Sequence, residues 1–129
     1  MAVIDHLILK VNDLPASIAF YTDIMGFSDR GSDGPFQVLQ VSPDFQLRLA
    51  PWGTAGFDHY AFAVSAAEFD EIYRRVREAG LDYGPGFDSV GENSGPGTEV
   101  GARGEAPALY FTDPNRHLIE IRTYERTAG

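Results

Sequence analysis

The sequence predicts an α+β fold built from two copies of a βαβββ module within 129 residues. Three observations support this prediction. A strand-like alternating segment is followed by an amphipathic helix at two places about half a chain apart. Each segment begins with an Asp-His pair, and each helix ends at a glycine. A repeat of this length indicates one duplication, because a solenoid needs at least about three shorter repeats.

The first module is expected over residues 1–52. Val3–Val11 alternates in polarity, which predicts a strand with one buried face. Asp13 and Pro15 follow as a helix cap and a first-turn proline. The helix itself is indicated by an apolar stripe with helical spacing, Leu14, Ile18, Tyr21 and Met25, and it ends at Gly26. Two further strands are expected at Phe36–Val41 and Phe45–Leu49.

The second module is expected over residues 57–125 and repeats this order. Phe57–Val64 is a strand, and Ser65 with Glu68 forms a capping box. The apolar stripe of the second helix consists of Phe69, Ile72, Tyr73 and Val76, and Gly80 ends it. The last strands are Ala108–Thr112 and Leu118–Thr123. A coincidental likeness of two strand-helix pairs is the alternative to a duplication.

A glycine-rich insertion, Pro85–Glu105, separates the second helix from the last hairpin. It shows almost no apolar periodicity, so we expect it to lack regular structure. Unstructured segments of this length inside a small domain are usually functional or mobile. The insertion is therefore either the border of a site or a plain connection.

Composition excludes several classes of function. Ten Lys+Arg against nineteen Asp+Glu give a formal net charge of -9, which argues against binding to nucleic acid or to an anionic membrane. Cysteine is absent, so the chain has no thiol nucleophile, disulfide or cysteine-ligated metal. No apolar run approaches the roughly 20 residues of a membrane span, and the first ten residues do not resemble a signal peptide. A cytoplasmic protein is the default expectation.

Two of the three histidines occupy equivalent places in the two modules. Strand alternation turns His6 and His59 away from the helix-packed face, and Glu120 shares that orientation. Two imidazoles and one carboxylate form a ligand set that leaves coordination positions open and suits Fe(II), Mn(II), Ni(II) or Zn(II). Taken singly, each residue is more often an exposed or hydrogen-bonded strand residue, so the prediction depends on the repeat-related placement.

Other polar residues share this face of the predicted strands. Arg48, Tyr110 and Arg122 all fall on it. If the face borders a cavity, these side chains can bind a small, anionic, oxygen-rich substrate through charge-assisted hydrogen bonds. If it faces solvent, they are ordinary surface residues. His117 has the opposite orientation and is expected to be structural.

Several stretches of the chain resemble the vicinal oxygen chelate superfamily, which includes glyoxalase I, extradiol dioxygenases, fosfomycin-modifying thiol transferases and bleomycin-resistance proteins. The stretches are Asp5-His6-Leu7, Asp13 to Tyr21 with Gly26-Phe27, His59-Tyr60-Ala61-Phe62, and Tyr110 to Glu120. The resemblance covers nearly the whole chain. It implies paired modules that curl into an open, barrel-like mixed sheet, usually in a homodimer. It also implies a divalent metal held by His6, His59 and Glu120, completed in some members across the dimer interface.

Several residues differ from the patterns of individual subfamilies, and these differences indicate which activities are not expected. Arg48 stands where glyoxalase I carries a glutamate that serves as ligand and base, so that activity is not expected. Ile8 replaces a threonine of the thiol transferases. Extradiol dioxygenases need an additional acid/base histidine, and His117 has the wrong orientation for it. Arg116 replaces the usual turn glycine, so that corner must adopt another turn type or be strained.

The sequence therefore predicts a divalent-metal-dependent enzyme that acts on a small, anionic, oxygen-rich molecule. The metal would serve as a Lewis acid toward vicinal oxygens of the substrate, as the resemblance implies. The alternative is a non-catalytic protein of the same fold that binds a small molecule or an antibiotic. The bleomycin-type binders generally lack the metal ligands, which favours the enzyme.

Overall fold

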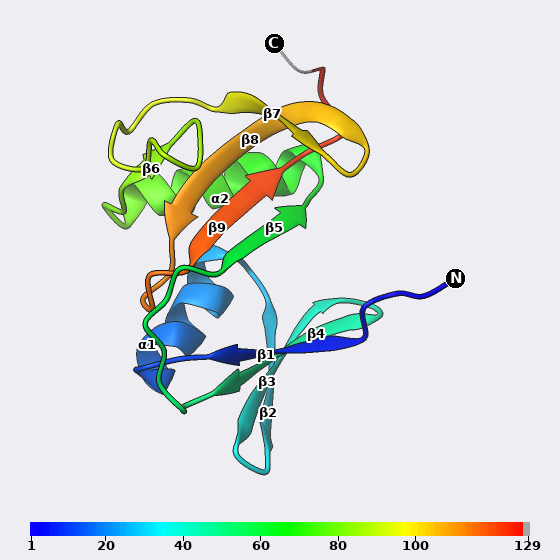
Figure 1. Cartoon of the computed structure of the whole chain (residues 1–129), viewed down its shortest axis with the longest axis vertical. Coiled ribbons are helices and arrows are strands. Elements are labelled where there is room, and N and C mark those ends of the chain that lie inside the picture. Colours follow the sequence, from blue (N-terminus) through cyan, green and yellow to red (C-terminus); the bar gives the residue numbers. More distant parts are fainter. Residues whose placement is uncertain (128–129) are drawn as a thin grey trace. The chain divides into compact units, whose positions relative to one another are not determined.

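The computed structural model describes residues 1–127. They form two compact units, with the boundary between Gly56 and Phe57. Each unit contains one sheet and its own helical segment (Figure 1). The first unit consists of β1 (His6–Lys10), α1 (Leu14–Ala19), η1 (Phe20–Ile24), β2 (Ser28–Asp33), β3 (Phe36–Ser42) and β4 (Phe45–Ala50). The second consists of β5 (His59–Ala63), α2 (Ala66–Glu78), β6 (Tyr83–Gly84), β7 (Gly97–Gly101), β8 (Gly104–Thr112) and β9 (Leu118–Arg122).

The two sheets have the same topology. Their strand orders are β1-β4-β3-β2 and β5-β9-β8-β6, and β7 pairs additionally with β8. In each sheet the first strand pairs in parallel with the last strand, and the other pairings are antiparallel. This correspondence confirms the predicted α+β fold with a repeated βαβββ order. Neither sheet closes into a barrel, and no helix within residues 1–127 is long and apolar enough to cross a bilayer.

The core of the first unit lies between α1–η1 and its sheet. Leu9, Leu47 and Leu49 are almost completely buried, as the strand alternation predicts. The Asp13 side chain caps α1 by accepting a hydrogen bond of 3.1 Å from the Ala16 backbone N–H. Pro15 occupies the first turn, where its missing N–H leaves no helical hydrogen bond unmade.

The predicted first helix is a regular α-helix only in its first half. From Phe20 it widens into the π-helix η1, in which the Met25 N–H donates to the Phe20 carbonyl at 3.2 Å. The hydroxyl of Thr22 donates to the Ile18 carbonyl at 2.7 Å and competes with the backbone for that acceptor. Gly26 then adopts a φ of 78°, as expected of a glycine just past a helix.

Strand β2 was not predicted from the sequence. Its residues, Ser-Asp-Arg-Gly-Ser-Asp, are polar on both faces and nearly all exposed. The strand lies at the sheet edge and pairs only with β3, with a register shift between Asp29 and Ser32. Backbone pairing and polar side-chain contacts hold this edge strand, such as the hydrogen bond of 2.6 Å from Gln37 Nε2 to Asp29 Oδ1. It therefore leaves no apolar periodicity in the sequence.

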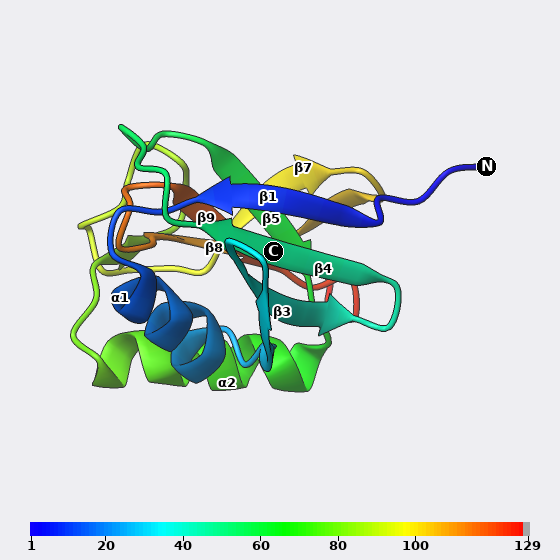
Figure 2. The ribbon, with the colours of Figure 1, turned by 90° about the horizontal axis from the view of Figure 1, so that it is seen from below.

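The second unit places α2 against one face of its sheet (Figure 2). The predicted capping box is present: the Glu68 N–H donates to Ser65 Oγ at 3.1 Å, and the Ser65 N–H donates to Glu68 Oε1 at 3.4 Å. The buried side chains of this core come from one stripe of α2 and from the inner faces of β8 and β9, namely Phe69, Ile72, Val76, Leu109, Phe111, Ile119 and Ile121.

The glycine-rich insertion is partly regular, which corrects the prediction that Pro85–Glu105 lacks structure. Gly97–Gly101 forms β7, and Gly101 lies opposite Gly104 across a tight turn to β8. Five residue pairs join the two strands, from Gly97 with Ala108 to Gly101 with Gly104. The glycines conceal this hairpin in the sequence because they contribute no side-chain alternation.

Arg116 adopts a φ of 70°, in the left-handed region that favours glycine. It lies in the turn before β9, where its N–H donates to the Asp113 carbonyl at 3.1 Å. The backbone strain expected from the missing turn glycine is therefore present. Buried hydrogen bonds from the Asn115 and His117 N–H groups to Asp113 Oδ1, at 2.8 and 2.9 Å, hold the turn in place.

Replacing Arg116 by glycine should stabilise the protein by about 0.5 to 1 kcal/mol, because glycine adopts this φ without strain. Urea unfolding followed by circular dichroism measures the change. Arg116→Ala is the matched control: it removes the same side chain but retains Cβ, so it should give no gain. Equal stabilisation by both substitutions would show that the side chain, not the backbone conformation, causes the effect.

Candidate functional site

His59 and Glu120 meet on the face of the second sheet that points away from α2. His59 begins β5 and Glu120 lies in the middle of the adjacent parallel strand β9. Nε2 of His59 faces Oε1 of Glu120 at 3.0 Å. The imidazole is 46% exposed and the carboxylate only 5%. The pair is thus open to solvent on the histidine side and anchored inside the unit on the glutamate side.

Arg122 fixes the other oxygen of Glu120. Its NH1 lies 2.7 Å from Glu120 Oε2, and the Arg122 side chain is itself only 5% exposed. NH2 of Arg122 donates to the carbonyls of Glu99 and Gly104, at 2.9 and 3.1 Å. The guanidinium therefore joins the carboxylate in β9 to the β7–β8 hairpin. A buried carboxylate with this partner keeps one defined orientation.

Tyr110 approaches the same carboxylate from the opposite strand. It is the register partner of Glu120 in the β8–β9 pair, and its ring lies 6.0 Å from the ring of His59. Burial and then the negative charge of Glu120, which also accepts a hydrogen bond from the phenol, raise the pKa of Tyr110. The phenol therefore stays protonated at neutral pH and acts as a hydrogen-bond donor.

A hollow of about 320 Å³ opens beside Glu120 and Arg122, within the size range of small-molecule sites. It is lined by Ala61, Ala63, Val100, Gly101, Ala102, Arg103, Glu120, Arg122 and Tyr124. Gly101 is needed for this packing, because a Cβ there would lie 2.4 Å from Cζ of Arg122. Ala61 and Ala63 of β5 contribute only small methyl groups to the lining.

His6 and Arg48 belong to the first unit and share one face of its sheet. His6 begins β1, the position equivalent to His59 in β5. Its Nδ1 lies 2.7 Å from Oδ2 of Asp5, which leaves Nε2 for another ligand. Arg48 contacts Asp33 Oδ2 at 3.0 Å and Gln46 Oε1 at 3.3 Å. The structure thus brings two of the predicted metal ligands together, and residues 1–127 contain no group of three His, Asp or Glu side chains arranged to hold a metal.

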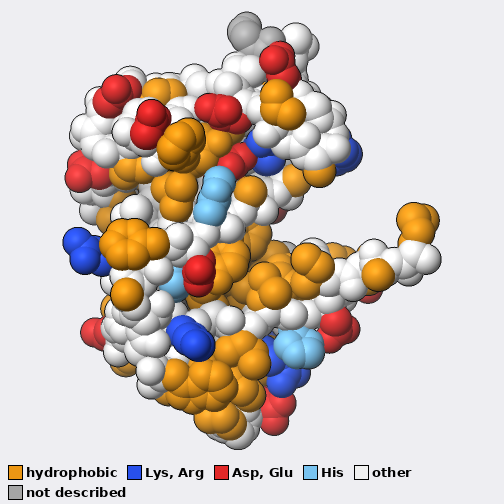
Figure 3. Space-filling model, viewed as in Figure 1, with side chains coloured by type: hydrophobic (Ala, Val, Ile, Leu, Met, Phe, Trp, Pro, Cys, Tyr) orange, Lys and Arg blue, Asp and Glu red, His pale blue; other side chains and the backbone are white. Residues whose placement is uncertain are grey.

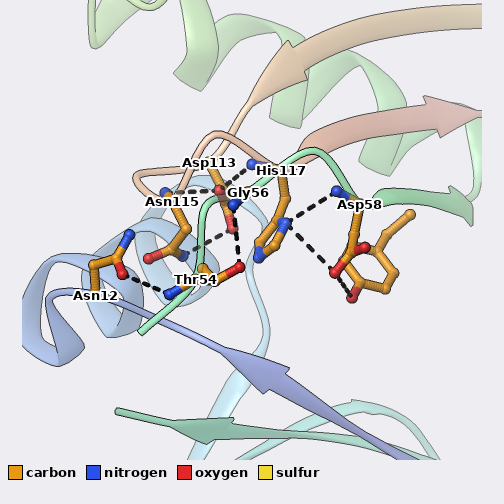
Figure 4. A network of polar contacts seen from close by, with 8 residues as sticks. Asn12, Thr54, Gly56, Asp58, Asp113, Asn115 and His117 are labelled. Carbon is orange, nitrogen blue, oxygen red and sulfur yellow. Dashed lines mark hydrogen bonds and ion pairs between the residues drawn. The ribbon is translucent and has the colours of Figure 1, made fainter. Parts of the chain in front are cut away.

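His117 has a structural role at the start of β5. It is fully buried, and its Nδ1 accepts a hydrogen bond of 3.3 Å from the Asp58 N–H (Figure 4). The Tyr60 ring meets its ring edge-on at 5.7 Å. Burial and then the charge of Asp58 raise the pKa of Tyr60 to about 12, so its hydroxyl remains a donor to Asp58 at 3.2 Å. These contacts fix the backbone that precedes His59.

Arg103 and Tyr124 line the hollow but were not singled out from the sequence. Arg103 occupies the turn between β7 and β8, inside the insertion that was expected to lack structure. Tyr124 follows the last strand, where periodicity ends. Neither residue has a motif or a repeat-related partner, so only the hairpin geometry reveals them.

The geometry agrees with a known family. Residues 3–121 match the sequence model of the Glyoxalase/Bleomycin resistance protein/Dioxygenase superfamily. The chain belongs to this superfamily. The resemblance expected from the Asp-His pairs and from the Tyr110–Glu120 stretch is thereby confirmed.

Relatives within the superfamily have different names and activities. The solved structure of the oxidase ChaP-H2 is 34% identical and has a TM-score of 0.78, covering 99% of this chain and 96% of that one. The metallothiol transferase FosB of Shouchella clausii is 24% identical over 97% of this chain and 88% of its own length. The virulence protein STM3117 of Salmonella typhimurium is 29% identical over 94% of this chain and 83% of its own length.

Removing Arg122 should destabilise the second unit, because Glu120 would remain buried without its cation. We expect Arg122→Met to lower the free energy of unfolding by about 3 kcal/mol. Urea unfolding measures the loss. The double variant Glu120→Gln/Arg122→Met should recover a substantial part of it, since no buried charge is left.

Arg74→Met is the matched control for this cycle. Arg74 also contacts carboxylates, those of Glu71 and Glu78, but on the exposed surface of α2. Exposed ion pairs contribute little to stability, so this variant should unfold near the wild-type midpoint. Single and double variants of equal stability would contradict the role assigned to the buried pair.

Proposed function

We propose that this protein is a divalent-metal-dependent enzyme that acts on a small, anionic, oxygen-rich substrate. The observation that carries the proposal is the convergence of His59 Nε2 and Glu120 Oε1 at 3.0 Å beside a hollow of about 320 Å³. Membership in the superfamily supports it, as do the relatives named as an oxidase and a metallothiol transferase. His59 and Glu120 would hold the metal together with His6.

The donor atoms of these residues fit a divalent ion. Arg122 occupies Oε2 of Glu120, so Oε1 is the oxygen that remains for a metal, and it faces an imidazole nitrogen. Asp5 engages Nδ1 of His6, the outer contact that commonly orients a metal-binding imidazole. Two nitrogens and one oxygen suit Fe(II), Mn(II), Ni(II) or Zn(II) and leave positions open for substrate.

A bound divalent ion would supply Lewis acidity toward vicinal oxygens of the substrate. The protein's own side chains hold the arrangement in place. Arg122 balances the charge of Glu120 and restricts it to one free oxygen. Tyr110 stays a phenol and can donate its hydrogen bond to a substrate oxygen instead of Glu120. Arg48 and Arg122, both already in contact with a carboxylate, are further candidates to bind an anionic substrate.

We further propose that the protein forms a homodimer. The N-terminal segment that precedes β1 projects from the first unit and carries the exposed apolar side chains of Met1, Val3 and Ile4 (Figure 3). Ile8 in β1 is also 43% exposed. Apolar side chains gathered on one segment favour contact with another protein surface. In such a dimer, the third metal ligand at each site would be His6, from the same chain or from the partner chain.

Oxidation is the reaction class that we favour among those of the named relatives. The oxidase ChaP-H2 shares 34% of its residues with this chain, against 24% for the metallothiol transferase FosB. A second candidate, a non-catalytic protein that sequesters a small molecule in the hollow, would need neither His59 nor a metal. Metal content therefore separates the two candidates.

Wild-type protein purified without chelator and loaded with Fe(II), Mn(II), Ni(II) or Zn(II) should retain roughly one ion per chain, measured by elemental analysis. His59→Ala and Glu120→Gln should each lose it, because one of three ligands is gone. His6→Ala should do the same if His6 completes the set. Glu92→Gln, which removes an exposed carboxylate of the same unit, is the matched control and should keep the ion.

Retention of the metal by His59→Ala would contradict the ligand assignment. Absence of metal from wild-type protein under every loading condition would contradict the enzyme mechanism and favour sequestration. If His59→Ala loses the metal ion but His6→Ala retains it, the third ligand comes from elsewhere in the chain.

If the reaction is an oxidation, the Fe(II)-loaded protein should consume oxygen with vicinal diols, catechols or hydroxyquinones. An oxygen electrode measures the uptake. Glu120→Gln should reduce it to the rate of free Fe(II), whereas Glu92→Gln should leave it unchanged. If wild-type protein consumes oxygen no faster than free Fe(II) with every one of these substrates, oxidation is contradicted. Thiol addition then becomes the favoured reaction class.

A further inference from the structure

The arginines predicted to bind substrate already have protein partners. The NH1 and NH2 groups of Arg122 are used by Glu120 and by two backbone carbonyls. Arg48 donates to Asp33 and Gln46. The Nε donors of both arginines have no partner, but they are buried. An incoming anion would therefore have to compete with the contacts of the terminal nitrogens. A cation with unused donors would bind the anion at lower cost.

Arg103 is such a cation. Its guanidinium lies over the ring of Tyr124, with Cζ 4.1 Å from the ring centroid. Its backbone N–H donates to the Tyr124 hydroxyl at 3.2 Å, so the turn and the ring are held together. Within residues 1–127 its guanidinium has no carboxylate or carbonyl partner. Stacking on a ring leaves the N–H donors at the guanidinium edge directed outward.

The charges around Arg103 indicate where an anion would lie. Arg103 and Tyr124 border the hollow beside Glu120 and also a second hollow of about 400 Å³. The first hollow contains two arginines and one carboxylate, and that carboxylate is already paired with Arg122. The second contains Glu68 and Glu125 with Arg103 as its only cation. An anion is therefore favoured in the hollow that contains Glu120.

We propose that Arg103 binds a carboxylate of the substrate and thereby determines specificity at the metal site. This inference rests on the proposed function. The substrate class is a compound with two vicinal oxygens for the metal and a separate carboxylate a short distance away. The fork of N–H donors on an arginine matches the two oxygens of a carboxylate. Tyr124 holds the guanidinium in place, so less freedom is lost on binding.

Two probes separate the carboxylate from the chelating group. Catechol and 3,4-dihydroxybenzoate both carry vicinal hydroxyls, but only the second has a carboxylate. Titration of the Mn(II)-loaded protein without oxygen, followed by calorimetry, gives both dissociation constants. In Arg103→Gln, binding of 3,4-dihydroxybenzoate should weaken about tenfold relative to wild type, as expected for one charge-assisted contact, while catechol binding stays unchanged.

Arg77→Gln is the matched control. Arg77 lies over the ring of Tyr73 at 4.4 Å, in the same unit but on α2. Its removal changes the net charge equally and should leave both affinities unchanged. Arg103→Lys retains the charge without the planar fork and should recover only part of the affinity. Equal weakening by Arg103→Gln and Arg77→Gln would overturn the proposal, because it would show a general charge effect.

The outcomes for the two proposals are distinguishable. If metal and catechol bind but Arg103→Gln leaves 3,4-dihydroxybenzoate binding unchanged, the inference about Arg103 is wrong and the proposed function stands. If no metal binds, the proposed function fails, and 3,4-dihydroxybenzoate is titrated into metal-free protein with detection of the Arg103 side-chain N–H by NMR. A shift of that signal with 3,4-dihydroxybenzoate but not with catechol would support carboxylate binding, and its absence would overturn it.

Discussion

The buried ion pair between Glu120 and Arg122 is the interaction on which the candidate site depends. A carboxylate inside a protein is costly unless a cation and hydrogen bonds compensate for its lost hydration. Arg122 provides the cation, and the carbonyls of Glu99 and Gly104 accept its remaining NH2 hydrogens. The same guanidinium thereby holds Glu120 in position and fastens the β7–β8 hairpin to the sheet. Without it, neither the carboxylate nor the wall of the hollow has a defined place.

The two modules share a topology, but the second sheet has one strand more than the first. Each begins with an Asp-His pair on a strand that runs parallel to the last strand of its sheet. Only the second module adds a hairpin strand, β7, beside β8. That strand brings Gly101 and Arg103 to the edge of the hollow. The duplicated framework thus supplies histidines at equivalent positions, and an addition to one copy supplies the pocket.

The successes and failures of prediction follow from the range of the interactions involved. Strand alternation correctly placed His59 and Glu120 on one face, and local capping chemistry located α2 to within a residue or two. The edge strand β2 and the hairpin strand β7 were missed because backbone pairing holds them and their side chains show no periodicity. The change to a π-helix at Phe20 was missed because the apolar stripe has the same spacing before and after it. The Thr22 hydroxyl, which donates to the Ile18 carbonyl there, forms no recognisable motif.

The sequence by itself determined the α+β fold class, the repeat, the superfamily and the residue types available for a metal, because these depend on local periodicity and on motif spacing. Only the tertiary structure decided which arginine hydrogen-bond donors already have a partner within the protein. Arg122 lies in a predicted strand and Arg103 in the glycine-rich insertion, but neither local context indicates which partner the guanidinium has. The folded chain buries one against Glu120 and leaves the other stacked on Tyr124 with its edge exposed. Burial and partner choice depend on distant segments, so they are defined only once the chain is folded.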